Sequence, residues 1–115
     1  MIYRKLDEQP VTVDLRLTDD LFIKTAVVPL AGTVIPSHAH AYDHVTLLAV
    51  GRMSVWADDV PLGEFTGPTG ILIRAKVKHR MLTLTDGVVF ACVHALHGTD
   101  DVEIHEEHHL TIEEA

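Results

Sequence analysis

The apolar residues of this chain occur in short runs, and glycine, proline or acidic residues close most of them. The runs cover residues 21–30, 45–50, 53–57, 71–73, 80–85 and 88–96. Their lengths and their β-branched residues are typical of strands, and strands at this spacing favour an antiparallel sandwich or barrel. The sequence therefore predicts an all-β fold without an internal repeat, and any helix is expected only in the acidic tail after Gly98.

Glycine, proline and acidic pairs also predict where the strands are connected. Tight hairpins are expected at Gly51-Arg52 and Asp86-Gly87, a loop is expected to open at Asp58-Asp59, and residues 63–70 are dense in glycine and proline, which disfavour regular strands. In the first hairpin, Gly51 supplies the backbone conformation that other residues rarely adopt.

Length and composition limit the class of protein. A chain of 115 residues with 47% hydrophobic residues forms one domain, with a core at about 20–98 and an acidic tail at 99–115. Its net charge of −8 argues against a nucleic-acid partner. The N-terminal residues have no apolar signal sequence, and no apolar run is long enough to cross a membrane. Because the single cysteine, Cys92, cannot form an internal disulfide, we expect a cytoplasmic protein.

Three histidines, His38, His40 and His44, lie close together in the sequence. Imidazole is a frequent ligand of transition metals, and the first two of these residues share one face of an extended strand. On a straight strand, His44 would lie about 13 Å beyond His40, too far for one metal ion. The chain must therefore turn within residues 41–43 if all three bind one ion, and His79 is the best candidate for a fourth ligand.

The spacing around these histidines resembles the first conserved motif of the cupin superfamily, G-x5-H-x-H-x3,4-E-x6-G. The matching positions are Gly32, His38, His40, His44 and Gly51. Pro36 also stands where cupins often carry proline, whereas His44 replaces the family's glutamate. The resemblance implies a small single-domain cupin, which is an antiparallel β-barrel or jelly roll, with a four-histidine variant of the metal site.

A second cupin motif, G-x5-P-x-G-x2-H-x3-N, is met only loosely by residues 67–83. Its histidine corresponds to His79, but Arg74 and Lys76 replace its proline and glycine, and Thr83 replaces its asparagine. The two motifs cover about half of the chain in the order of a one-domain cupin. The alternative is a degenerate cupin in which the histidines only line an empty pocket.

Four imidazoles leave a divalent metal with its full charge and two open positions if the ion is octahedral. Such a site suits iron, nickel, zinc or copper, the cupin resemblance adds manganese, and the sequence does not choose among them. The resemblance implies a metal-dependent oxygenase acting on a small chelating substrate, such as an enol, a diketone or a catechol. A metal-dependent isomerase or lyase and a non-catalytic small-molecule or metal sensor remain alternatives.

Other residues are weaker candidates for the pocket. Tyr42 is a candidate to contact the substrate or to be a packed aromatic at the rim, and His94 a candidate acid–base group or an exposed histidine near a strand end. Met81 and Thr83 should share the inward face of His79. Either face of the last strand could line the barrel. Cys92 is expected to be a small buried residue and not a reactive thiol.

The tail contains an H-E-x-x-H pattern, at residues 105–109, that resembles the zinc site of metalloproteases. Too few residues follow for a third ligand, so we expect a solvated terminus that could bind metal adventitiously. The domain is expected to form a homodimer, because small barrels with exposed edges tend to pair. Possible interface residues, each of which could equally be core, are Leu15, Leu17, Phe22 and Trp56.

Overall fold

A computed structural model describes residues 4–5, 12–39 and 42–96, which form ten strands. The strands are β1 (Arg4–Lys5), β2 (Thr12–Leu17), β3 (Leu21–Val28), β4 (Thr33–His38), β5 (His44–Val50), β6 (Arg52–Ala57), β7 (Val60–Thr66), β8 (Thr69–Ile73), β9 (His79–Thr83) and β10 (Val88–Ala95). The predicted all-β class is confirmed. In the described ranges, no helix has the length and apolar character needed to cross a membrane.

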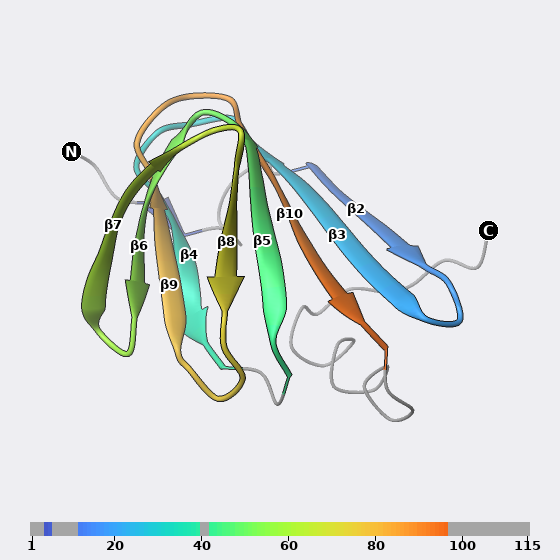
Figure 1. The fold of residues 1–115 in the computed structure, drawn as a ribbon. Coiled ribbons are helices and arrows are strands. Elements are labelled where there is room, and N and C mark those ends of the chain that lie inside the picture. The colour runs from blue at the N-terminus through green and yellow to red at the C-terminus, as the bar shows by residue number, and fades with distance from the viewer. Residues whose placement is uncertain (1–3, 6–11, 40–41, 97–115) are drawn as a thin grey trace.

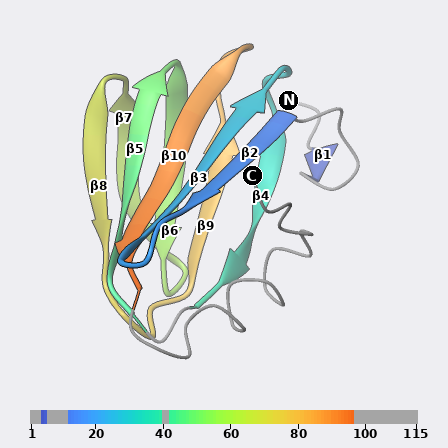
Figure 2. The same ribbon diagram turned by 90° about the vertical axis from the view of Figure 1, so that its right-hand side faces the viewer.

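The strands form two five-stranded sheets that face each other (Figures 1 and 2). The first sheet has the order β1-β4-β9-β6-β7, and the second has the order β2-β3-β10-β5-β8. The short strand β1 runs parallel to β4, and the other pairs are antiparallel. In Figure 1, β4 and β10 end at the lower end of the molecule, where β5 and β9 begin.

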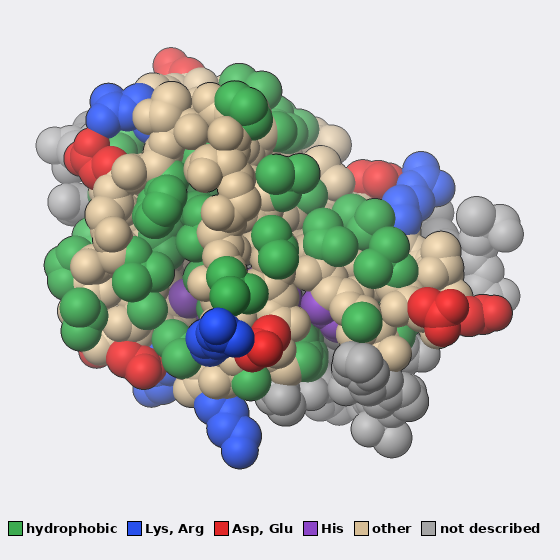
Figure 3. All heavy atoms as spheres, viewed as in Figure 1, with side chains coloured by type: hydrophobic (Ala, Val, Ile, Leu, Met, Phe, Trp, Pro, Cys, Tyr) green, Lys and Arg blue, Asp and Glu red, His purple; other side chains and the backbone are tan. Residues whose placement is uncertain are grey.

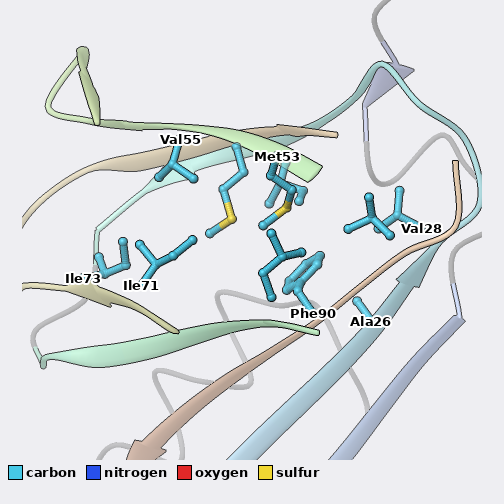
Figure 4. Packing of buried hydrophobic residues seen from close by; sticks show 11 residues of the cluster. Ala26, Val28, Met53, Val55, Ile71, Ile73 and Phe90 are labelled. Atoms are coloured by element: carbon cyan, nitrogen blue, oxygen red, sulfur yellow. The ribbon is translucent and has the colours of Figure 1, made fainter. Parts of the chain in front are cut away.

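Period-two alternation turns one face of each sheet toward the space between them. The buried hydrophobic cluster there consists of Ala26, Val28, Ile35, Leu48, Met53, Val55, Ile71, Ile73, Met81, Val88 and Phe90 (Figure 4). Complete burial of a side chain such as Leu48 contributes roughly 1.5–3 kcal/mol to stability. The cluster fills the space between the two sheets, and the buried residues His44 and His79 lie at the lower end, where β5 and β9 begin.

Although residues 63–70 are dense in glycine and proline, they form the end of β7, a bend at Gly67 and Pro68, and the start of β8. β7 is the edge strand of its sheet and pairs only with β6, so Pro61 and Gly63 interrupt no second ladder. A Cβ on Gly67 would lie 2.7 Å from the backbone of Ala49, so this glycine permits a close approach between strands. The proline and glycines of this segment are therefore explained by an edge strand and by a close contact between strands.

The two acidic residues after β6 form a two-residue hairpin turn, where the sequence predicted a longer loop. Asp58 and Asp59 have φ values of 48° and 63°, and Ala57 pairs with Val60 across the turn. Aspartate is among the few residues other than glycine that tolerate such dihedrals.

The two predicted hairpins are wrong, because the turns at Gly51-Arg52 and Asp86-Gly87 each connect strands that belong to different sheets. The conformation predicted for Gly51 is nevertheless observed. Gly51 has φ of 95°, and a Cβ placed on it would lie 2.7 Å from Val88 Cγ2 and 2.8 Å from Thr85 Oγ1. The turn carries the chain from β5 in one sheet to β6 in the other. Both the dihedral and the lack of space therefore require glycine at this position.

Of the four possible interface residues, Phe22 is core, with only 1% of its surface exposed. Leu15 and Leu17 are half-buried and pack against the small cluster of Phe22 and Tyr42. Trp56 is half-buried beneath Arg80, whose guanidinium carbon lies 4.7 Å from the centre of the indole ring.

Candidate metal centre

Two of the predicted ligands come together from opposite sheets. His44 is the first residue of β5 and His79 is the first residue of β9, and their ring centroids are 4.9 Å apart. Only 4% of His44 and 1% of His79 is exposed. Two imidazoles that bind one metal at ~2.0–2.1 Å must approach about this closely.

The backbone brings a third predicted ligand position to the same end. β4 ends at His38, which is the cross-strand partner of His79, after a register shift that follows Ile35. β4 and β5 belong to different sheets, so the chain changes direction between His38 and His44, as a shared site requires. His40 lies outside the described residues.

Among the side chains that the structure describes, no group of three His, Cys, Asp or Glu could hold a metal ion. Of the four predicted ligands, the structure thus describes the side chains of His44 and His79. A complete site needs the side chains of His38 and His40, which the structure does not describe.

Two aspartates, neither of which the sequence predicted to belong to the site, hold the turn before β9. Asp43 Oδ1 accepts a hydrogen bond of 2.7 Å from the backbone N–H of Ala75, and its Oδ2 lies 3.7 Å from Arg74 Nη1. Asp58 Oδ1 accepts a hydrogen bond of 3.0 Å from the backbone N–H of Lys78. The two carboxylates, which accept these hydrogen bonds from the backbone, therefore fix the segment that leads to His79.

A stack of rings lies beside the histidine pair. The ring of His94 stacks on Tyr42 at 4.0 Å and on Phe22 at 4.8 Å, and Tyr42 meets His44 edge-on at 6.4 Å. The alternative of an exposed His94 is wrong, because only 6% of this residue is exposed. Tyr42, which is 9% exposed, is a buried contact of His94 and not a residue of the open rim.

The orientation of His94 is also fixed by a hydrogen bond. Its Nδ1 lies 2.8 Å from the carbonyl oxygen of Ala95. A carbonyl oxygen only accepts, so Nδ1 carries the hydrogen and donates it. His94 is therefore a positioned imidazole near the pair and not a mobile surface residue.

Similar proteins are found by comparison of structures and not by comparison of sequences. No protein-family model matches the chain, and no curated protein matches its sequence. An RmlC-like cupin from Methanocaldococcus jannaschii with a double-stranded β-helix fold matches with a TM-score of 0.69 and 20% identity, over 89% of this chain and 94% of that one. The chain has the cupin fold.

Two further structures agree with this assignment. KdgF from a Halomonas species matches with a TM-score of 0.67 and 13% identity, over 79% of this chain and 83% of that one. An RmlC-like cupin from Shewanella frigidimarina matches with a TM-score of 0.66 and 16% identity, over 79% of this chain and 80% of that one. The predicted cupin barrel is confirmed, and at these identities the likeness concerns the fold alone.

A lysine occupies the position of the glycine in the second motif, and its backbone conformation is unusual for a residue other than glycine. Lys76 occupies the glycine position and has φ of 64°, in the left-handed region. The turn before His79 thus keeps the conformation that glycine adopts readily, although a lysine there costs about 1 kcal/mol.

The last strand of the cupin barrel turns its even-numbered residues inward. Val88, Phe90 and His94 are buried and Cys92 is partly buried, whereas residues at odd positions are half-buried or exposed. This resolves which face of β10 lines the interior. The predicted inward face of β9 is likewise observed, because Met81 and Thr83 are buried with His79.

Cys92 has the character of an unreactive thiol. Burial raises the pKa of this thiol, and the charge of Lys24 and a hydrogen bond with Thr46 oppose that effect. The distance between Cys92 Sγ and Thr46 Oγ1 is 3.7 Å. Because its pKa is raised, the thiol stays protonated at neutral pH.

Sequence reasoning missed Lys24. It lies on β3 between the buried residues Phe22 and Ala26, in the same period-two phase, and only 8% of it is exposed. That phase was the available signal, since a charged residue in register with buried apolar residues must itself face inward. In contrast, every Asp and Glu among the described residues lies outside the buried interior.

The H-E-x-x-H pattern of residues 105–109 lies outside the described residues, like the rest of the tail from 97 onward.

Proposed function

We propose that this cupin binds one divalent transition metal through His38, His40, His44 and His79. The observation that carries the proposal is the 4.9 Å approach of the buried His44 and His79 rings from opposite sheets. The pairing of His38 with His79 supports it. The nitrogen donors suit iron, nickel, copper or zinc, and the cupin resemblance adds manganese.

We further propose that the protein is an oxygenase that acts on a small chelating substrate with an enol, diketone or catechol group. A divalent metal at this site would polarise the substrate oxygens as a Lewis acid. The chain's own residues orient the substrate and limit water. Phe22 and Tyr42 cover the two sides of His94, so this end of the barrel is walled by rings. His94 is the best-placed group to hold or transfer a proton beside the substrate.

The first experiment is elemental analysis of untagged protein that has been purified without added metal. We expect about one equivalent of a first-row metal, because four imidazole donors suffice to hold one ion. His38→Ala, His40→Ala and His79→Ala should each lose most of it. A chain without residues 103–115 controls for adventitious metal on the tail histidines and should stay loaded. Unchanged metal content in the His40→Ala variant would contradict the four-histidine site.

Oxygen uptake then separates the possible activities. We expect the iron- or manganese-loaded protein to consume oxygen with a catechol or diketone substrate. Turnover that persists without oxygen would replace the oxygenase by an isomerase or lyase. Tight ligand binding without turnover in every metal form would favour a sensor. We also propose a cytoplasmic location, because the lone Cys92 cannot form an internal disulfide.

A further inference from the structure

A hollow lies on the outer face of the first sheet, which faces away from the barrel interior. It has a volume of about 420 Å³ and is lined by residues of three neighbouring strands, β4, β9 and β6 (Figure 1). The lining residues are Val34, Ser54, Trp56, Arg80, Met81 and Leu82. Small-molecule sites commonly have volumes of about 300–1,000 Å³, so the hollow has the size of a ligand site.

Strand alternation brings the polar and apolar groups of the hollow together. On β9, His79 is buried between the sheets, and the alternation of the strand turns Arg80 and Leu82 to the other face. In the register of β6 and β9, Trp56 lies opposite Arg80 and Ser54 lies opposite Leu82. These four outward side chains are half-buried. A guanidinium, an indole ring, a hydroxyl and an aliphatic chain are thus gathered in one hollow.

Arg80 is the charged group of the hollow, and Trp56 restrains it. The guanidinium carbon of Arg80 lies 4.7 Å from the centroid of the indole ring. Contact with the ring limits the motion of the guanidinium, and the N–H donors in its plane keep their capacity to bind an anion. Within the described part of the chain, no carboxylate forms an ion pair with Arg80. Arg80 is therefore a positioned cation whose charge is not neutralised by a described neighbour.

The surroundings of Arg80 limit how much negative charge the hollow can accept. Glu64 of β7 lies opposite Ser54, and its Oε2 is 2.6 Å from Arg52 Nη2, so this carboxylate already has its own arginine. Among the described residues, Arg80 is the only charged residue that lines the hollow. The hollow therefore provides a counter-charge for one anionic group and apolar contacts for the rest of a ligand.

We infer that this hollow binds a small carboxylate with an apolar body, at a second site outside the barrel. Arg80 donates charge-assisted hydrogen bonds to the carboxylate, and the Ser54 hydroxyl supplies a further polar contact. The side chains of Val34, Leu82 and Trp56 cover the apolar body and remove it from water. The inference goes beyond the proposed function and does not depend on a bound metal.

The test compares 4-cyclohexylbutanoate with its neutral amide, 4-cyclohexylbutanamide. Trp56 is the only tryptophan of the chain, so a change in tryptophan fluorescence reports binding at this hollow. We expect the carboxylate to bind at least about tenfold more tightly than the amide, because only the carboxylate accepts charge-assisted hydrogen bonds from Arg80. Acetate, which has the charge but no apolar body, should bind at least about tenfold more weakly than 4-cyclohexylbutanoate.

Variants of the arginine assign the preference to one residue. Arg80→Met keeps an apolar stem against the indole ring, so it should abolish the preference for the carboxylate while leaving the affinity for the amide within about twofold. Arg80→Lys should keep part of the preference, because it retains the charge. Arg16→Met is the matched control and should retain the full preference, since it removes an exposed arginine from β2 in the other sheet.

Three results would overturn the inference. The first is no binding, or equal binding of the carboxylate and the amide, in the wild-type protein. The second is a preference that persists in Arg80→Met, because the carboxylate would then bind elsewhere. The third concerns the acidic tail at 99–115 as a competing occupant of the hollow. If a chain without residues 103–115 bound 4-cyclohexylbutanoate more than about tenfold more tightly than the full chain, the tail would be the natural occupant.

Discussion

His44 stands where the cupin motif carries glutamate, and its ring is buried against His79. A glutamate there would give the metal an anionic ligand in place of a neutral one. We therefore expect His44→Glu to retain about one equivalent of metal and to bind 3,4-dihydroxybenzoate about tenfold less tightly, because the site loses a positive charge. His44→Leu, of similar size but without a donor atom, should lose the metal. Elemental analysis and calorimetry measure both effects, and full metal in His44→Leu would exclude His44 as a ligand.

The thiol of Cys92 predicts a dependence on pH. Burial raises its pKa in the folded state, so above the unfolded pKa the unfolded chain holds fewer protons than the folded one. The contribution of Cys92 to the free energy of unfolding should therefore be constant below about pH 8 and decline as the pH rises from the unfolded pKa through the folded pKa. Cys92→Ala should remove part of this decline in urea titrations from pH 7 to 10. Rapid alkylation of the folded wild-type protein at pH 7 would contradict the raised pKa.

At the scale of the element, the turn before β9 carries a residue that its backbone does not favour. Lys76 has φ of 64°, so Lys76→Gly should raise the free energy of unfolding by about 0.5–1 kcal/mol. Lys78→Gly, outside the left-handed region, should lower it by a similar amount. Thermal unfolding of the two variants gives the comparison. Destabilisation by Lys76→Gly would mean that the lysine side chain itself supports the turn.

The turns at Gly51 and Gly87, which each connect the two sheets, separate two costs of replacing a glycine. Gly51→Ala meets both a positive φ and a Cβ contact of 2.7 Å with Val88, whereas Gly87→Ala has a φ of 68° and nothing within 4 Å. We expect a loss of about 1 kcal/mol at Gly87 and about 2–4 kcal/mol at Gly51. Urea unfolding measures both, and equal losses would mean that the neighbours of Gly51 move aside at little cost.

At the scale of the whole molecule, an apolar surface on β5 and β8 supports a homodimer. Val45 and Leu72 are cross-strand partners with 40% and 51% of their surfaces exposed, and Leu47 is 44% exposed. Figure 3 shows many hydrophobic side chains on the face that β5, β7 and β8 present to the viewer. We propose that a second copy covers this surface, since β8 is also an edge strand.

Light scattering after gel filtration should give twice the mass of the 12.7 kDa chain. Leu72→Lys should weaken the dimer by at least about tenfold, because it places a charge in the apolar contact. Val60→Lys, at the turn between β6 and β7, is the matched control and should leave the dimer intact. A monomeric wild-type protein at micromolar concentration would reject the homodimer.

The sequence predicted the barrel and the positions of most strands, because alternation and turn residues are local signals. It could not identify β7, because Pro61 and Gly63 disfavour a strand. They are tolerated in β7 because this strand lies at the edge of its sheet, which the sequence does not reveal. It could not orient β10, because both of its faces are apolar. The burial of His94 and the inward position of Lys24 depend on neighbouring strands that a single run of residues does not reveal.

The position of the histidine pair should affect how the two sheets separate when the protein unfolds. His44 belongs to one sheet and His79 to the other, and no strand is shared between the two. A metal held by both would act as a cross-link between layers that otherwise adhere only through packing and connecting loops. Metal binding would then add to the free energy of unfolding in proportion to the logarithm of the metal concentration. Amide hydrogen exchange should therefore be slower in both β5 and β9 when metal is bound than in the metal-free protein. This measurement detects the metal and requires no substrate.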